Sequence, residues 1–186
     1  MFIAGVDEAG RGPLAGPVVS AAVILNSQYV INGINDSKKL SAEKRQSLSN
    51  EIKMHSVSWS IGIATCQEID QINILRASLL SMERAIKNLS EVPEKVIVDG
   101  QYTPDIDVPC EAIIRGDTIV ESIMAASIIA KVERDKIMLE LDKEYPNYGF
   151  GQHKGYPTKL HLKALRELGP CREHRQSFRP VKDFLS

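Results

Sequence analysis

The chain has 186 residues, of which 43% are hydrophobic and 25% charged. This size and composition suit one globular domain with a sizeable core. No apolar run approaches the roughly 20 residues of a membrane-spanning helix, and the formal net charge of −1 does not point to a nucleic-acid binder by itself.

The three cysteines, Cys66, Cys110 and Cys171, are odd in number and far apart. They form no C-x-x-C pair, so the sequence indicates neither a disulfide framework nor a zinc site. The N-terminus shows no signal-peptide pattern, and a reduced, cytoplasmic protein is expected.

Positive charge gathers towards the C-terminus. From Phe150 onward there are eight Lys and Arg against three Asp and Glu, whereas the preceding part holds fifteen against twenty-one. A basic segment beside an acidic body suits a protein that binds metal in one place and phosphate in another. An ordinary solvated surface would give the same count.

The first predicted element is a strand that begins at Phe2, and Asp7 and Glu8 follow where this strand should end. Neighbouring strand residues point to opposite faces, so the two carboxylates converge only where the strand gives way to a turn. Such a pair suits a divalent cation. A solvated strand end is the plainer explanation of an isolated Asp-Glu pair.

A loop rich in Gly and Pro comes next. Gly10 and Gly12 would let backbone N–H groups approach a ligand, and Arg11 adds a cation that could bind phosphate. The alternative is a turn without a ligand, but the Gly-Arg-Gly run directly after two carboxylates favours a site.

The pattern then predicts a second, mostly buried strand at residues 17–25, antiparallel to the first because the connection is short. Ser41 is the expected N-cap of a helix that ends near residue 53. Residues 56–65 alternate as a third strand, and residues 67–89 form one long amphipathic helix.

The second half continues with alternating elements. The expected order is a buried strand at 95–99, a strand at 110–115, a long helix from 116 to about 141, a loop at 145–157, a helix at 159–168 and an irregular basic end. This succession predicts an α/β fold with a mixed sheet covered on both faces. We expect a single domain over residues 1–186, with a small helical and basic C-terminal segment at about 145–186.

Two further carboxylates stand at element boundaries. Asp99 ends the buried strand, as Asp7 ends the first, and ligand sites of open α/β sheets form at the carboxyl ends of strands. A strand-ending turn would also explain Asp99-Gly100. Asp117 precedes a helix and could serve only as its N-cap.

Two loops carry candidate substrate contacts. Lys38 and Lys39 precede a helix and could meet phosphates, although most lysine pairs are simply solvated. Tyr156 is fixed between Gly155 and Pro157, with Lys154 two residues before it. A packed loop aromatic is the plainer explanation of this tyrosine.

Several ordered motifs resemble those of bacterial ribonuclease HII, the type 2 ribonucleases H. They span nearly the whole chain and are Asp-Glu-Ala-Gly-Arg-Gly-Pro-Leu-Ala-Gly-Pro-Val-Val from Asp7, Asp-Ser-Lys-Lys-Leu from Asp36, Val-Asp-Gly around Asp99, Gly-Asp at 116–117 with Ala-Ala-Ser-Ile-Ile-Ala-Lys-Val from Ala125, His-Lys-Gly-Tyr-Pro-Thr from His153, and His-Arg-Gln-Ser-Phe from His174. We assign the last motif no catalytic role. Ribonuclease HIII is the nearest relative that could be confused with this family, but it carries an extra N-terminal domain before its carboxylate pair.

The resemblance implies a ribonuclease H-like fold with a central five-stranded sheet. It implies a metal-dependent endoribonuclease that cuts the RNA strand of RNA–DNA hybrids and the 5′ side of ribonucleotides embedded in duplex DNA. The products would end in 3′-hydroxyl and 5′-phosphate, and such cleavage would remove misincorporated ribonucleotides and RNA primers.

The resemblance also implies roles for particular residues. Two-metal hydrolysis with Mn²⁺ or Mg²⁺ is expected, and the enzyme is expected to be a monomer that binds nucleic acid. The implied metal ligands and catalytic residues are Asp7, Glu8, Asp99 and Asp117. The implied substrate-binding residues are Gly10, Arg11, Gly12, Lys38, Lys39, Lys154 and Tyr156, the tyrosine packing on the sugar next to the cleaved ribonucleotide.

Other functions fit the sequence less well. Residues 10–16 do not form G-x-G-x-x-G, and Pro13 spoils the helix start that a dinucleotide site needs. The chain contains neither a P-loop nor the G-x-S-x-G of a serine hydrolase. A nucleic-acid-binding module with structural carboxylates remains the competing hypothesis, and excess chelator separates it from a metal-dependent nuclease.

Overall fold

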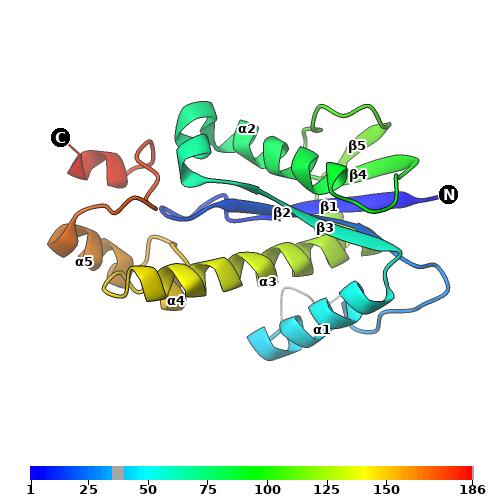
Figure 1. Cartoon of the computed structure of the whole chain (residues 1–186), viewed down its shortest axis with the longest axis horizontal. Coiled ribbons are helices and arrows are strands. Elements are labelled where there is room, and N and C mark those ends of the chain that lie inside the picture. The colour runs from blue at the N-terminus through cyan, green and yellow to red at the C-terminus, as the bar shows by residue number, and fades with distance from the viewer. Residues whose placement is uncertain (35–39, 186) are drawn as a thin grey trace.

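The central strand of the fold is β1 (Ile3–Ala9), and it is followed by β2 (Val18–Ile24) in an antiparallel pair. This hairpin appears at the centre of the computed structural model, which describes residues 1–34 and 40–185 (Figure 1). Lys38 and Lys39 lie outside the described residues. The prediction of a hairpin at the start of the chain is confirmed.

Three further strands complete a mixed sheet in the order β3-β2-β1-β4-β5. β3 (Ser58–Ala64) pairs antiparallel with β2, whereas β4 (Lys95–Asp99) and β5 (Cys110–Ile113) run parallel to β1. Val, Ile and Ala fill β2 and β4 almost continuously, as expected for strands that are covered on both faces. The predicted α/β class with five strands is confirmed.

Helices cover both faces of the sheet (Figure 1). α2 (Cys66–Lys87) packs on one face, and α1 (Ala42–His55) and α3 (Glu121–Glu144) lie on the other. α3 is central because its apolar residues between Ile123 and Val132 are buried against β1 and β2. Gly5 permits this close approach, since a Cβ there would overlap the backbone of Ser122.

α2 differs from the single uninterrupted helix that the apolar stripe predicts. Asn73 has φ 70° and ψ 166°, so the helix is kinked there. The Asn73 side chain accepts a hydrogen bond from the N–H of Arg76, which makes it the N-cap of the second half. The helix begins with a capping box between Thr65 and Glu68 that the sequence prediction missed.

The region before α3 also differs from the prediction. Residues from Gly116 form a 3₁₀ turn, η2 (Gly116–Thr118), and not the first turn of the long helix. Val120 is extended and precedes α3 as its N-cap, with no side-chain capping bond. The proposed role of Asp117 as N-cap of the long helix is therefore wrong.

The C-terminal segment packs back onto the loop that follows β1. It contains α4 (Phe150–His153), α5 (Lys159–Leu168) and the 3₁₀ turn η3 (Val181–Phe184), so the region predicted as an uninterrupted loop at 145–157 holds a short helix. Leu14 packs against Leu165 and Val181, which joins this segment to the start of the chain.

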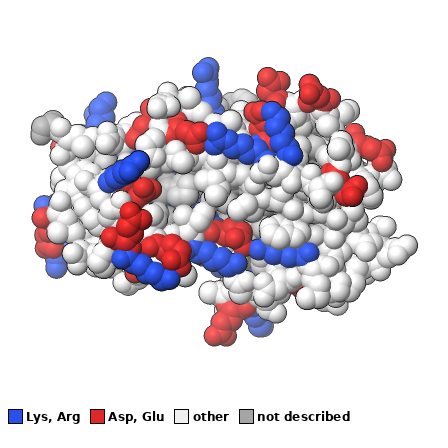
Figure 2. Space-filling model, in the orientation of Figure 1, with Lys and Arg blue, Asp and Glu red and all other residues white. Residues whose placement is uncertain are grey.

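Charge is interspersed on the visible face of the molecule (Figure 2), where Lys and Arg alternate with Asp and Glu over the helices. No helix among the described residues is both long and apolar enough to cross a membrane.

Candidate active site

Asp7 and Glu8 lie inside β1. The sequence had placed them after the end of this strand. β1 continues to Ala9 in its pairing with β2, but its pairing with β4 stops at Val6. The pair therefore sits where the sheet opens between two parallel strands. Asp7 is 6% exposed, and its Oδ1 accepts a hydrogen bond from the Glu8 N–H over 2.8 Å.

Asp99 lies beside Asp7 across this opening. The last paired residues of the parallel strands are Val6 and Val98, so Asp7 and Asp99 are the next residues on adjacent strands. This is the arrangement that the two strand-end carboxylates predict. Asp99 also reaches the fourth predicted residue, since its Oδ1 accepts from the N–H of Asp117 over 3.2 Å.

The electrostatics of this cluster favour a bound cation. Burial, then the charge of Glu8, then that of Asp99 raise the pKa of Asp7 well above its usual range. Burial also raises the pKa of Glu8, and Asp99 adds to the rise although Arg11 opposes it. Glu8 Oε2 is buried without a hydrogen-bond partner. Crowded carboxylates with an unpartnered oxygen fit a divalent ion.

The carboxylates are not arranged as a closed ligand cage. Within residues 1–34 and 40–185, no three His, Cys, Asp or Glu side chains form a ready-made metal site. The assignment of the four carboxylates as metal ligands stays a prediction.

The Gly-Pro loop after β1 is held by two buried arginines that the sequence analysis did not select. Arg134 of α3 donates to the carbonyls of Ala15, Pro17 and Lys154 at 2.9–3.1 Å. Arg175 donates to the carbonyls of Gly10, Arg11, Gly16 and Pro17 at 2.6–3.3 Å. Gly10 has φ 98°, and a Cβ there would overlap the Arg134 side chain.

These arginines are charged groups in a dry environment. Burial lowers the pKa of Arg134 to about 10 and that of Arg175 to about 9, and the charge of Arg134 adds to the shift at Arg175. Both remain protonated at neutral pH. The sequence signal was present for Arg175, since it lies in the His-Arg-Gln-Ser-Phe motif.

A cavity of about 420 Å³ opens beside the carboxylates. Four predicted residues, Gly10, Arg11, Gly12 and Tyr156, line it together with Glu8. The structure therefore brings the loop after β1 and the distant tyrosine loop into one site. Tyr156 is 40% exposed, and a Cβ on Gly12 would lie 3.7 Å from its ring carbon Cε1.

Three polar residues of the cavity were missed. Ser127 and Lys131 are four residues apart on α3, and Arg45 comes from α1. The signal for the first two was their i, i+4 spacing within an otherwise apolar stretch. Lys131 Nζ lies 5.9 Å from the ring centroid of Tyr156 and 2.8 Å from Asp135.

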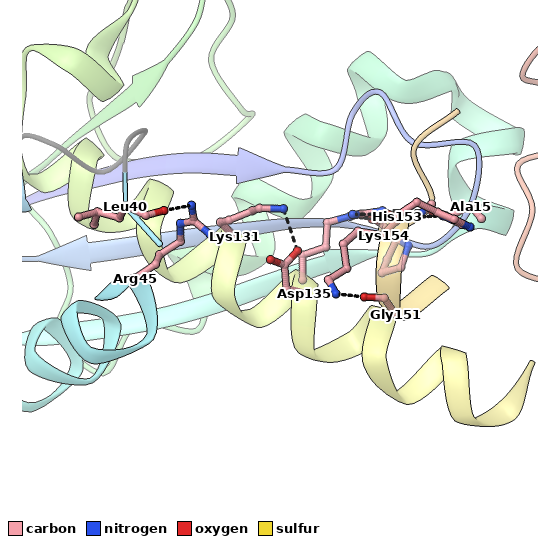
Figure 3. A network of polar contacts seen from close by, with 11 residues as sticks. Ala15, Leu40, Arg45, Lys131, Asp135, Gly151, His153 and Lys154 are labelled. Atoms are coloured by element: carbon pink, nitrogen blue, oxygen red, sulfur yellow. Dashed lines mark hydrogen bonds and ion pairs between the residues drawn. The ribbon is translucent and has the colours of Figure 1, made fainter. Parts of the chain in front are cut away.

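Among the described residues predicted to bind substrate, Lys154 is the one that does not line this cavity. Figure 3 shows its side chain turned towards Gly151, whose carbonyl accepts a hydrogen bond from Nζ, whereas Arg45 binds the carbonyl of Leu40. Lys154 lines a neighbouring hollow that it shares with Arg45 and Asp135.

Known proteins resemble this chain along nearly its whole length. The family model for Ribonuclease HII matches residues 4–181. Ribonuclease HII of Nitrosococcus oceani is 56% identical over 183 residues, which cover 98% of this chain and 91% of the relative.

Solved structures show the same architecture. The ribonuclease H2 of Pyrococcus horikoshii OT3 superposes with a TM-score of 0.82 at 26% identity, covering 99% of this chain and 97% of the other. Bst-RNase HIII, crystallised in complex with Mn²⁺, has a TM-score of 0.77 over 100% of this chain and 69% of the other, and its 18% identity shows the fold alone. Because the family model and the Nitrosococcus relative both span nearly all of it, the chain belongs to the ribonuclease HII family and is an endoribonuclease with ribonuclease H activity.

Proposed function

We propose that this endoribonuclease cuts the RNA strand of RNA–DNA hybrids and the 5′ side of single ribonucleotides embedded in duplex DNA. The products end in 3′-hydroxyl and 5′-phosphate, and the cellular task is removal of misincorporated ribonucleotides and RNA primers. One observation carries the proposal: Glu8, which follows Asp7 in β1, lines a cavity together with Gly10, Gly12 and Tyr156.

Asp7, Glu8, Asp99 and Asp117 are the proposed ligands of Mn²⁺ or Mg²⁺ ions. The raised pKa values of Asp7 and Glu8 and the unpartnered Glu8 Oε2 support this assignment. Divalent ions held by these carboxylates would supply an activated water and stabilise the leaving 3′-oxygen, the chemistry of two-metal hydrolysis. The protein's part is to hold charged oxygens at the opening of the sheet before the ions arrive.

The loop after β1 is proposed to recognise the ribonucleotide. Only the 2′-hydroxyl distinguishes RNA from DNA at one nucleotide, so the site needs groups that bond it. Arg175 fixes the carbonyls of Gly10 and Arg11. A backbone held in this way can present its peptide groups to the sugar without moving, and the absence of side chains at Gly10 and Gly12 allows close approach.

Tyr156 is proposed to pack on the deoxyribose that follows the ribonucleotide. Its half-exposed ring at the rim of the cavity supports this contact. Phosphate binding is assigned to Arg11, which lines the cavity, and to Lys154, which lines the neighbouring hollow. Lys38 and Lys39 are assigned to phosphate from the sequence motif alone. Lys131 and Arg45 join this group because they line the same cavity as Arg11.

The remaining parts of the proposal concern the whole protein. We propose one catalytic domain over residues 1–186, because the segment from about 145 is tied to the loop after β1 through Arg175 and Leu14. The partner is nucleic acid, the protein is a cytoplasmic monomer, and no membrane takes part.

A chelator experiment tests the proposed chemistry. Hybrid cleavage by the wild type is measured with Mn²⁺ or Mg²⁺, after excess EDTA, and after the metal is restored. The expected result is full loss with EDTA and recovery with metal, with Asp7→Asn inactive throughout. Undiminished cleavage in EDTA would overturn the metal assignment.

A further inference from the structure

The backbone that carries Tyr156 is hydrogen-bonded at every polar group. The Lys154 carbonyl accepts a hydrogen bond from Arg134 Nη1 over 2.9 Å. The Gly155 carbonyl accepts one from the Leu14 N–H, and the Tyr156 carbonyl one from the Thr158 N–H, each over 2.8 Å. The Lys154 N–H donates to the Phe150 carbonyl over 2.9 Å, and the Tyr156 N–H donates to the His153 carbonyl over 3.0 Å. The Gly155 N–H donates to His153 Nδ1 over 3.1 Å. An exposed aromatic ring therefore stands on a backbone that cannot shift without breaking several bonds.

The Tyr156 carbonyl has a second donor that leads into the protein interior. His161 Nδ1 lies 3.0 Å from this oxygen, and His161 Nε2 lies 3.0 Å from His174 Nε2. The Cys171 N–H in turn donates to His174 Nδ1 over 2.9 Å. Two histidines thus form a chain of hydrogen bonds from the Cys171 backbone to the Tyr156 backbone.

The direction of each bond in this chain is fixed by chemistry. A carbonyl only accepts, so His161 Nδ1 carries a proton, and an N–H only donates, so His174 Nδ1 is bare. Neutral His174 then has its proton on Nε2 and donates to the bare Nε2 of His161. The chain closes with both rings neutral and in opposite tautomers.

One extra proton would break the chain, because a proton on His161 Nε2 would face the Nε2–H of His174, and a proton on His174 Nδ1 would face the Cys171 N–H. Burial, before any other cause, lowers the pKa of both residues to about 4, so both are neutral at pH 7. Their side chains are at most 1% exposed.

A third histidine supports the same loop. His153 stacks on His161 with ring centroids 4.2 Å apart, accepts from the Gly155 N–H, and binds the Tyr148 carbonyl through Nε2 over 2.8 Å. Phe150 lies against all three imidazole rings. The histidines are therefore packed from several sides, and none lines the cavity of the active site.

We propose that His161 and His174 are positioning residues, which act through the Tyr156 carbonyl to hold the tyrosine ring where it meets the sugar beside the cut. This inference rests on the proposed role of Tyr156. It gives a function to two histidines that touch neither the carboxylates nor the cavity, and it predicts that they affect substrate choice and not metal binding.

Nitrogen NMR of the ¹⁵N-histidine-labelled protein at pH 7 tests the chain directly. The account predicts the Nδ1–H tautomer for His161 and the Nε2–H tautomer for His153 and His174, with assignments made from His→Asn variants. A charged imidazolium at His161 or His174, or the same tautomer at both, would overturn the chain.

Cleavage rates on two substrates test the positioning role. The substrates are a duplex with one embedded ribonucleotide and a long RNA–DNA hybrid, and the readout is their rate ratio. His161→Ala should lower the ratio about tenfold, the size expected from one lost hydrogen bond. His161→Asn should recover part of it, because its amide can still donate near the Nδ1 position. His174→Asn serves as a second variant that keeps the acceptor for the Cys171 N–H.

A double-mutant cycle with Tyr156→Ala separates positioning from general damage. In the Tyr156→Ala background, His161→Ala should change the ratio no further. His55→Asn is the matched control, since His55 stacks on Tyr29 and lies outside the cavity.

Three results would overturn the inference. Additive effects of His161→Ala and Tyr156→Ala would mean that His161 acts elsewhere. An unchanged ratio in folded His161→Ala and His174→Asn would refute the positioning role alone, provided that Tyr156→Ala changes it. An unchanged ratio in Tyr156→Ala would remove the proposed role of the tyrosine and the inference with it.

Discussion

Arg175 Nη2 donates to the backbone carbonyl of Gly10 over 2.6 Å, although the two residues are 165 positions apart in sequence. The bond ties the C-terminal segment to the loop that follows the proposed catalytic carboxylates Asp7 and Glu8. All acceptors of this guanidinium are backbone carbonyls. The planar fork of arginine can satisfy several carbonyls at once, which a lysine ammonium cannot.

The first prediction concerns this arginine. Arg175→Lys should lower the free energy of unfolding by roughly 2–4 kcal/mol, because the buried carbonyls lose partners and a charge stays in a dry site. Cleavage should fall with it, since the Gly10–Gly12 backbone is no longer fixed. Urea unfolding and hybrid cleavage measure the two effects.

Arg179→Lys is the matched control, because the Arg179 side chain is 83% exposed and its Nε lies 3.9 Å from an Asp183 carboxylate oxygen that is itself exposed. It should change stability by less than about 0.5 kcal/mol. An Arg175→Lys protein as stable and active as this control would refute the structural role of Arg175.

The second prediction sets stability against activity at Asp7. Its pKa is raised, so the folded protein binds a proton more readily than the unfolded chain, and ionisation above the usual carboxyl range costs stability. Asp7→Asn should raise the melting temperature in EDTA at pH 7 and reduce cleavage at least a hundredfold, or roughly 2.7 kcal/mol. Thermal unfolding measures the expected rise in melting temperature, and cleavage assays measure the expected fall in rate. A less stable variant would contradict the electrostatic account, and near-normal activity would remove Asp7 from the ligand set.

The third prediction concerns Asp117. Because Val120 is the N-cap of α3, Asp117→Asn should leave helix stability unchanged. The rate should still fall at least tenfold, since a charged oxygen beside Asp99 is lost. Circular dichroism and cleavage assays separate the two. An unchanged rate would leave Asp117 a structural residue.

The carboxylate positions were predictable because the pattern is local. A buried apolar run followed by Asp at residues 7 and 99 predicts both near the carboxyl ends of strands. In the structure each Asp comes directly after the last residue that pairs β1 with β4, which brings the two together. The tyrosine loop was found through its motif. That it faces Gly12 depends on contacts between the two ends of the chain, which no local pattern encodes.

The errors have equally physical causes. Asn73 looks like an ordinary exposed position in a helical stripe, and its role as an internal cap appears only with the backbone turn it makes. η2 is separated from α3 by the extended backbone of Val120, and the Asp117 N–H bonds to Asp99 of β4. That contact joins residues from different elements, which no local pattern encodes. The buried position of Arg134 was not predicted, because a charged residue in a helix normally faces solvent.

The fourth prediction concerns pH. His161 and His174 have lowered pKa values, so the unfolded chain takes up protons that the folded protein refuses as the pH falls from about 6.5 to about 4. Their contribution to stability is complete above this window and is lost within it, on the order of 3 kcal/mol for each histidine.

The raised pKa values of Asp7 and Glu8 act in the opposite direction, stabilising the fold as the pH falls. The comparison is therefore between wild type and His161→Asn by urea unfolding at several pH values, because the carboxylate contribution is common to both. The variant should lose less stability on acidification. If the free energy of unfolding fell equally with pH in wild type and His161→Asn, the neutral state of His161 and His174 would be contradicted.

Mapping the cut in a DNA duplex with one embedded ribonucleotide tests the central claim most directly. With Mn²⁺ or Mg²⁺, the account predicts a single cut on the 5′ side of the ribonucleotide, with 3′-hydroxyl and 5′-phosphate ends and no cut in the all-DNA duplex. Asp7→Asn should leave this substrate intact. Cleavage on the 3′ side, cleavage of the all-DNA duplex, or an undiminished rate in Asp7→Asn would contradict the account.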